Sequence, residues 1–237
     1  MMQERYLGDS HDFLKFALLR QLYSELRLRL GVNWYLTEPG EVDRPGNNDG
    51  EKRHHLKGGV WQNADPDLFD RIHRFESPAN RVLANVAKWG LLPADTIYYD
   101  KPVASLEREA WHRQGVASLE AANLVFLDPD NGFEVKSMSV RTQPKYAFFA
   151  EVADYLAAGH VVVAIQFARQ CDPVQRAIEV RKKLIDLYGR AASLPVVRGR
   201  VAPNLLFFAL GPDSRLVEIK LALHDFVGKC QKAELID

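Results

Sequence analysis

The stretch Asn123–Glu134, N-L-V-F-L-D-P-D-N-G-F-E, decides the fold class of this chain. Its uninterrupted apolar run, 124–127, is typical of a strand that a parallel sheet buries on both faces. Asp128 ends the run, and in open α/β sheets the groups that bind ligands follow the carboxyl ends of strands. Pro129 and the Asn131–Gly132 pair favour a tight turn, so we expect its carboxylates to point outward. The alternative is a polar turn whose side chains only satisfy nearby backbone N–H groups.

Strands and helices alternate on both sides of this stretch. Apolar runs predict further strands at 32–37, 96–100, 160–167, 196–201 and 204–210. Helical spacing predicts helices at about 10–30, 65–75, 77–89, 105–119, 144–158, 173–189 and 216–227. This alternation predicts an α/β fold with a Rossmann-like, mostly parallel sheet and helices on both faces. The last two strands are close enough in sequence to form an antiparallel hairpin at the edge of the sheet.

The domain organisation follows from length and composition. No internal repeat, low-complexity tract or change of composition divides the 237 residues, so we expect a single α/β domain over 1–237. Residues 38–95 begin with a long polar segment rich in glycine and proline. Long loops of this kind inside compact domains are usually functional or disordered, so this region is the expected insertion or lid.

The charge and cysteine content exclude several classes of protein. Lys plus Arg and Asp plus Glu number 31 each, which argues against a protein that mainly coats nucleic acid but allows an enzyme with a local basic groove. No apolar run approaches the roughly 20 residues that cross a bilayer, and the N-terminus has no signal pattern, so we expect no membrane span. Cys171 and Cys230 lie far apart, which fits a cytoplasmic protein. The oligomeric state is not indicated.

The N-terminal segment carries a second set of candidate residues. Asp9 or Ser10 is the expected N-cap of the first helix, and Gly31 its expected end. Asp12 and Lys15 then lie three residues apart on one face of the first turn. In isolation, the simplest interpretation of this pair is a favourable helix-dipole partner and a solvated lysine.

The order of these motifs resembles the large-subunit ribosomal-RNA adenine-N6 methyltransferases, within the S-adenosylmethionine-dependent methyltransferase superfamily. Those proteins open with a glycine, Asp-x-x-Lys and an amphipathic helix, to which Gly8, Asp12 and Lys15 correspond. They carry Asp-Pro-Pro-Tyr after an apolar strand, to which 128–131 corresponds. The resemblance covers most of the chain in order, with a shorter middle, and implies a methyltransferase-type sheet.

The resemblance also implies a reaction and a site. In that family the motif's aspartate and loop backbone hold the target amine, and its aromatic residue stacks on the flipped base. The implied cofactor is S-adenosylmethionine, and the implied partner is RNA or DNA. The implied catalytic residues are Asp128, Pro129, Asp130, Asn131, Lys15 and Asp12. The expected cofactor-binding residues are Glu38, Gly40, Asp100, Gly8 and Gln166, with Asp100 for the ribose hydroxyls and Gln166 chosen because its strand ends at the same edge as Asp128.

Two departures from the family pattern matter for this site. Asp130 and Asn131 stand where the family has a second proline and the aromatic residue, so Phe133 or another side chain would have to stack on the base. The turn after the first strand, 38–42, contains one glycine and two acids where a glycine-rich turn is expected.

Two other functions therefore stay open. A metal-dependent phosphodiesterase would use Mg²⁺ or Mn²⁺, for which oxygen ligands are plentiful if the fold gathers them. These ligands are Asp128, Asp130, Asn131, Glu134, Asp9, Asp12 and Asp49. The altered glycine turn also fits a methyltransferase-like scaffold that has lost its cofactor and acts as a binding module.

Overall fold

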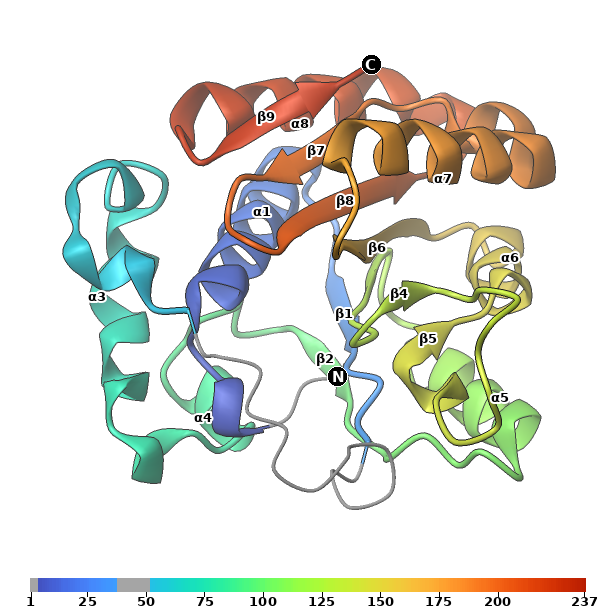
Figure 1. The fold of residues 1–237 in the computed structure, drawn as a ribbon, viewed down its shortest axis with the longest axis horizontal. Coiled ribbons are helices and arrows are strands. Elements are labelled where there is room, and N and C mark those ends of the chain that lie inside the picture. Colours follow the sequence, from blue (N-terminus) through green and yellow to red (C-terminus); the bar gives the residue numbers. More distant parts are fainter. Residues whose placement is uncertain (1–3, 38–51) are drawn as a thin grey trace.

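The computed structural model of the protein describes residues 4–37 and 52–237. Its centre is a seven-stranded sheet with helices on both faces (Figure 1). In spatial order the strands are β2 (Ile97–Tyr99), β1 (Leu30–Asn33), β3 (Leu124–Leu127), β6 (Val161–Ala168), β8 (Asn204–Leu210), β7 (Val196–Gly199) and β9 (Ala233–Ile236). A separate two-stranded sheet pairs β4 (Gly132–Phe133) with β5 (Tyr146–Ala147).

Helices cover the two faces of the sheet in two groups. The first group consists of α1 (Ser10–Leu26), α3 (Pro66–Ile72), α4 (Ala84–Lys88) and α8 (Leu216–Lys229), and the second of α5 (Arg108–Ser118), α6 (Phe149–Ala157) and α7 (Pro173–Tyr188). The side chains of β3 alternate between these groups, because Leu124 and Phe126 pack with the first and Val125 and Leu127 with the second. This explains why the run 124–127 is apolar at every position.

The sheet has a parallel half and an antiparallel half. β2, β1, β3 and β6 run parallel, whereas β8 is antiparallel to both β6 and β7. The expected Rossmann-like α/β fold is therefore confirmed. The β7–β8 hairpin is present, but β9 pairs antiparallel with β7 and forms the edge instead. The four residues of β9 were missed because they are too few to show a periodic pattern.

The first helix ends earlier than expected. Arg27, in the left-handed conformation (φ 51°), ends it, and its N–H donates to the carbonyl of Tyr23 at 3.0 Å. Gly31 lies inside β1, where a Cβ would come within 2.8 Å of the Cβ of Ala122. Gly31 is therefore required for the close approach of β1 to the segment between α5 and β3, and it does not end the helix. The predicted helix 77–89 is also shorter, since within it only a 3₁₀ turn, Pro78–Asn80, and α4 form.

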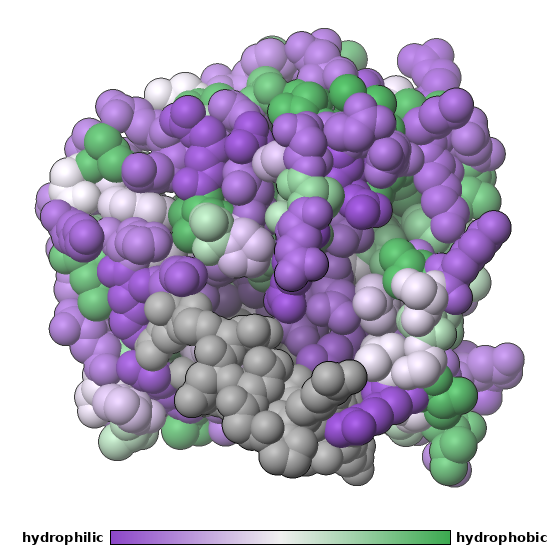
Figure 2. All heavy atoms as spheres, viewed as in Figure 1, coloured by the Kyte–Doolittle hydropathy of each residue, from purple (hydrophilic) through white to green (hydrophobic). Residues whose placement is uncertain are grey.

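The described part of the expected insertion, 52–95, packs against α1. Trp61, Leu68, Phe69 and Phe75 are buried in the same core cluster as the apolar face of that helix. The rest of the insertion, 38–51, lies outside the described residues, so its role as a lid stays a prediction. Hydrophilic residues dominate the face drawn in Figure 2, where hydrophobic residues appear in small groups. Within 4–37 and 52–237, no helix is long and apolar enough to cross a membrane.

Candidate active site

The N-cap of α1 places the first group of candidate residues. The carboxylate oxygen Oδ1 of Asp9 accepts the backbone N–H groups of His11 at 2.8 Å and Asp12 at 2.9 Å. Asp9 is therefore the N-cap, one of the two expected residues. The side chain of Asp12 accepts the N–H of Gly8 at 3.0 Å through Oδ2. This cap turns Asp12 and Lys15 into the molecule, where both are buried.

Asp128 lies at the point where the strand order changes direction. From β1 the chain continues to β2 on one side, and β3 pairs on the other side of β1. In open α/β sheets this reversal creates the crevice in which ligands bind, beyond the carboxyl ends of the strands. Asp128 directly follows β3, and its N–H donates to the carbonyl of Asn33 at the end of β1 at 3.0 Å.

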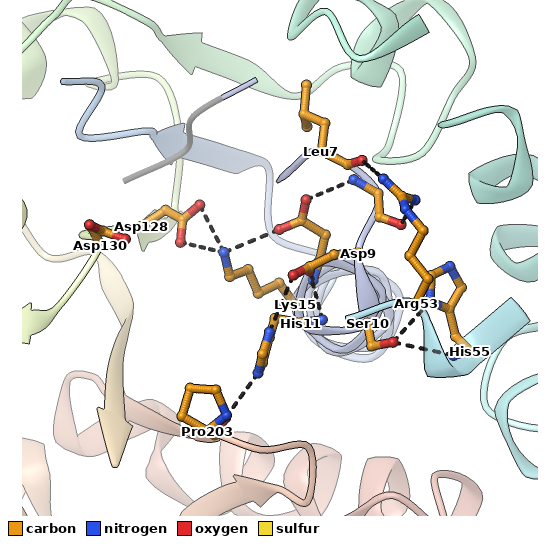
Figure 3. Close-up of polar contacts among 12 residues, drawn as sticks. Leu7, Asp9, Ser10, His11, Lys15, Arg53, His55, Asp128, Asp130 and Pro203 are labelled. Atoms are coloured by element: carbon orange, nitrogen blue, oxygen red, sulfur yellow. Dashed lines mark hydrogen bonds and ion pairs between the residues drawn. The ribbon is translucent and has the colours of Figure 1, made fainter. Parts of the chain in front are cut away.

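Lys15 joins the two groups. Its Nζ lies 2.9 Å from Oδ1 of Asp128 and 3.2 Å from Oδ1 of Asp12 (Figure 3). Asp128 is 1% exposed, so the expectation that its carboxylate points outward is wrong. A buried carboxylate is costly unless it is paired, and the ammonium group of Lys15 supplies the pairing charge. The interpretation of Lys15 as a solvated lysine is wrong for the same reason.

The shared ammonium group shifts the pKa values of its neighbours. Burial lowers the pKa of Lys15, but the charges of Asp128 and Asp12 outweigh burial and raise it, so Lys15 stays a cation. Burial raises the pKa of Asp12 to about 7 with the help of Asp9 and Asp128, although Lys15 opposes the shift. Two carboxylates thus compete for one cation, and Asp12 is the one that takes a proton near neutral pH.

The rest of the turn faces other partners. The carboxylate of Asp130 pairs with Nζ of Lys145 at 3.1 Å and lies 3.9 Å from Nη2 of Arg169. Burial raises the pKa of Asp130, but the nearby positive charges, including these two, bring it to about 2. Figure 3 places Asp130 on the far side of Asp128 from Lys15. The two acids of the turn therefore have different surroundings, because Asp128 contacts Lys15 of α1 whereas Asp130 pairs with Lys145.

Gln166 holds the turn in place from β6. Its Nε2 donates to the carbonyl of Asn131 at 2.9 Å, and its Oε1 accepts the N–H of Phe133 at 3.1 Å. Gly132 between them has φ +111°, and a Cβ there would lie 2.4 Å from Oε1 of Gln166. Gln166, expected to bind a cofactor, has its amide committed to the loop backbone. Phe133 is 2% exposed and stacks on Phe149 at 5.4 Å between ring centroids, so it offers no free face to a base.

The other residues expected to bind the cofactor differ in whether they are exposed, already bonded or outside the described residues. Asp100 follows β2 and is exposed at the same edge of the sheet as Asp128. Gly8 (φ +74°) lies in the site, but its N–H is already bonded to Asp12, and its Cα packs against Phe75. Glu38 and Gly40 lie outside the described residues.

A buried network beside the end of β1 was missed by sequence reasoning. The carboxylate of Glu151 accepts Nε of Arg108 at 2.5 Å and the hydroxyl of Tyr35 at 2.9 Å. Tyr35 has φ +47°, unusual for a bulky residue, and this contact helps to hold it there. Asn33 donates from Nδ2 to the hydroxyl of Tyr155 at 3.3 Å. These partners come from β1, α5 and α6, so no local spacing could have paired them.

His11 connects the site to the β7–β8 loop. Its Nε2 donates to the carbonyl of Pro203 at 2.9 Å, and its Nδ1 lies 3.3 Å from Oδ2 of Asp9. Burial lowers the pKa of His11, but Asp9 and the Pro203 carbonyl raise it by a larger amount. Because both partners accept hydrogen bonds, the geometry favours an imidazolium with protons on both nitrogens.

The oxygen ligands expected for a metal are bonded to side chains and backbone N–H groups of the protein. Asp9 caps α1, Asp12 and Asp128 share Lys15, and Oε1 of Glu134 accepts the N–H of Phe149 at 2.8 Å. Asp49 lies outside the described residues. Among residues 4–37 and 52–237, no group of three or more His, Cys, Asp and Glu could hold a metal ion.

No protein-family model matches this chain, and neither a curated protein nor a solved structure matches it significantly. Function is therefore inferred from the sheet, the Asp128 turn and the contact of that turn with Lys15 of α1.

Proposed function

We propose that this protein transfers a methyl group from S-adenosylmethionine to an amino group of a nucleic acid base. The observation that carries the proposal is the contact between Lys15 and Asp128 beyond the carboxyl end of β3. It unites, over 113 residues of sequence, the two motifs that resemble the ribosomal-RNA adenine-N6 methyltransferases. The half-parallel sheet with its antiparallel hairpin is the scaffold that this resemblance implies.

Asp128 is the acceptor for the target amine in this proposal. An ionised carboxylate has about four lone-pair positions, so the Lys15 contact leaves capacity for an N–H group. Lys15, whose own pKa is raised, supplies a positive charge at 2.9 Å that fixes the direction of the Asp128 carboxylate. Because Asp128 is almost completely buried, neighbouring side chains must move to admit a base. Catalysis then rests mainly on holding the amine in line with the methyl group.

The cofactor side of the site is the β1–β2 edge. S-adenosylmethionine supplies an electrophilic methyl group on a positively charged sulfur. Asp100 is exposed after β2, next to the end of β1, and its carboxylate suits the ribose hydroxyls. The register pairs Asn33 with Tyr99, so the residues that follow the two strands leave the sheet together. Asp100 is therefore the described residue on this edge that would hold the cofactor's ribose in this proposal.

Metal-dependent hydrolysis has less support, because the acids expected to gather around Mg²⁺ or Mn²⁺ are bonded to different cations and backbone N–H groups. A scaffold without a cofactor is the second alternative. Calorimetry with S-adenosylmethionine, its homocysteine product, Mg²⁺ and Mn²⁺ separates the three functions. Saturable binding of the first two ligands is the expected result, and no heat at high ligand concentration would overturn the proposal.

Transfer of a labelled methyl group to adenine-containing RNA and DNA oligonucleotides tests the reaction itself. Asp128→Asn should lower the rate at least about 100-fold, as removal of a key polar contact in an active site does. S-adenosylmethionine affinity should stay within a few-fold of wild type. Asp186→Asn, which removes an exposed acid from α7, is the control and should leave both quantities unchanged. Equal rates for the two variants would remove Asp128 from the mechanism.

A further inference from the structure

A pocket of about 250 Å³ lies directly beside the Asp128 turn. It is enclosed by the segment after the turn, the start of α6 and the first half of α7, three elements that lie together in Figure 1. Its lining includes Phe133, Lys136, Phe149, Arg176 and Lys183. Gln166, which holds the turn in place, also lines it, so the pocket and the turn are parts of one rigid unit.

The pocket and the edge proposed for the cofactor lie on opposite sides of Asp128. β3 lies between β1 and β6, and the edge proposed for the cofactor is on the β1 side. The pocket adjoins Gln166 of β6, on the other side of Asp128. A polynucleotide that presented one base to Asp128 and continued over the β6 side would carry its next nucleotide toward this pocket.

The lining of the pocket carries more positive than negative side chains. Lys136, Arg176 and Lys183 stand against Glu134 and Glu179, and Glu179 lies 4.0 Å from Nη1 of Arg176. Among the residues that the structure describes, no carboxylate pairs with Lys136 or Lys183. Nζ of Lys183 lies 3.9 Å from the ring centroid of Phe149, which holds this ammonium group over the pocket. Two exposed ammonium groups beside the apolar rings of Phe133 and Phe149 suit an anion attached to a larger organic group.

We propose that this pocket binds the phosphodiester group of the nucleotide next to the target base, through Lys136 and Lys183. The inference rests on the proposed function, because it names the part of the nucleic acid that this side of the site recognises. Both RNA and DNA carry the phosphodiester, so the contact itself does not choose between them.

Neutralising a phosphate releases counterions, which makes binding depend on salt. For single strands, each phosphate contact adds about 0.7 to the slope of log affinity against log salt concentration. Both lysines contact one phosphodiester group, so loss of the two together should lower that slope by about 0.7. It should also weaken binding about tenfold or more at low salt.

Fluorescence anisotropy of the full chain with adenine-containing single-stranded RNA and DNA, over a series of salt concentrations, tests this inference. The double variant K136Q/K183Q is compared with K182Q/K220Q, which removes the same charge from exposed lysines of α7 and α8. The expected result is the weaker binding and lower slope in the first variant alone, with either RNA, DNA or both. Equal effects of the two double variants, or no binding of either oligonucleotide by wild type, would overturn it.

Calorimetry with S-adenosylmethionine on the same samples separates this inference from the proposed function. Normal cofactor binding and methyl transfer with unchanged oligonucleotide affinity in K136Q/K183Q would reject the pocket and leave the methyltransferase in place. Absence of cofactor binding would reject the methyltransferase, and anisotropy would still decide whether the pocket binds phosphodiesters.

Discussion

Nζ of Lys15 lies 2.9 Å from Oδ1 of Asp128, so a side chain from the second turn of α1 neutralises a carboxylate at the end of β3. Both groups are buried, and neither charge would be tolerated at this position without the other. The contact therefore serves two purposes at once. It holds α1 against the sheet, and it fixes the position of the Asp128 carboxylate at the carboxyl end of β3.

Replacement of Lys15 by methionine should destabilise the protein strongly. The change leaves Asp12 and Asp128 buried without their cation, which typically costs about 3–5 kcal/mol. Urea unfolding at pH 7 measures the free energy of unfolding. Lys182→Met, at an exposed position of α7, is the control and should change it by no more than about 0.5 kcal/mol. A similar small change for Lys15→Met would mean that the ion pair contributes little to stability.

Gly8 and Gly59 provide a matched test of packing against backbone strain. Both have positive φ, +74° and +64°, but a Cβ on Gly8 would lie 2.4 Å from the Cβ of Phe75, whereas nothing lies within 4 Å at Gly59. Gly59→Ala should cost about 1–2 kcal/mol from backbone strain alone. Gly8→Ala should cost about 2–4 kcal/mol, since overpacking is added. Thermal and urea unfolding of the two variants give the comparison, and equal losses would contradict the packing argument.

Arg108 and Arg113, both on α5, allow a buried ion pair to be compared with an exposed one. Arg108 pairs with Glu151 in the interior, whereas Arg113 lies 3.8 Å from Glu109 with its side chain 71% exposed. Arg108→Met leaves Glu151 buried without its cation and should cost about 3–5 kcal/mol. Arg113→Met should cost no more than about 0.5 kcal/mol, because solvent screens the exposed pair. Urea unfolding measures the free energy of unfolding of both variants. A loss of stability in Arg113→Met as large as that in Arg108→Met would contradict the distinction between a buried and an exposed ion pair.

His11 should make stability depend on pH above 6.5, the ordinary pKa of histidine. Its folded-state pKa is raised above the ordinary 6.5 by Asp9 and the Pro203 carbonyl, against the effect of burial. The stabilisation by protonated His11 is therefore complete below pH 6.5 and is lost as pH rises through the folded-state pKa. The stability difference between wild type and His11→Gln should be larger at pH 6 than at pH 8. A difference that stays constant across this range would show that His11 is not a buried cation.

Some features of the site were predictable because they depend on neighbours in sequence. The run 124–127 identified a buried strand, and the acid after it identified the turn at its carboxyl end. Asp9 as a helix cap followed from its short polar side chain before an apolar helical pattern. Helix boundaries were less accurate. Gly31 was expected to end the first helix, but the structure requires a glycine there because Ala122 approaches its Cα closely.

The partners of the charged residues were not predictable, because each pair joins distant segments. Nothing near Glu151 in sequence indicates Arg108 or Tyr35, and nothing near Gln166 indicates the loop that it holds. The burial of Asp128 was mispredicted for the same reason. A carboxylate at this position is stable in the interior only because Lys15 pairs with it.

The sequence by itself determined the α/β class, the buried strand that ends at Asp128 and the cap that starts α1, since these depend on local periodicity and capping chemistry. Tertiary structure alone decided that Lys15 meets Asp128, that Gln166 is committed to the turn and that Lys136 and Lys183 share a pocket. The physical reason is that pairing between buried charges depends on distance in space, and strand order sets that distance.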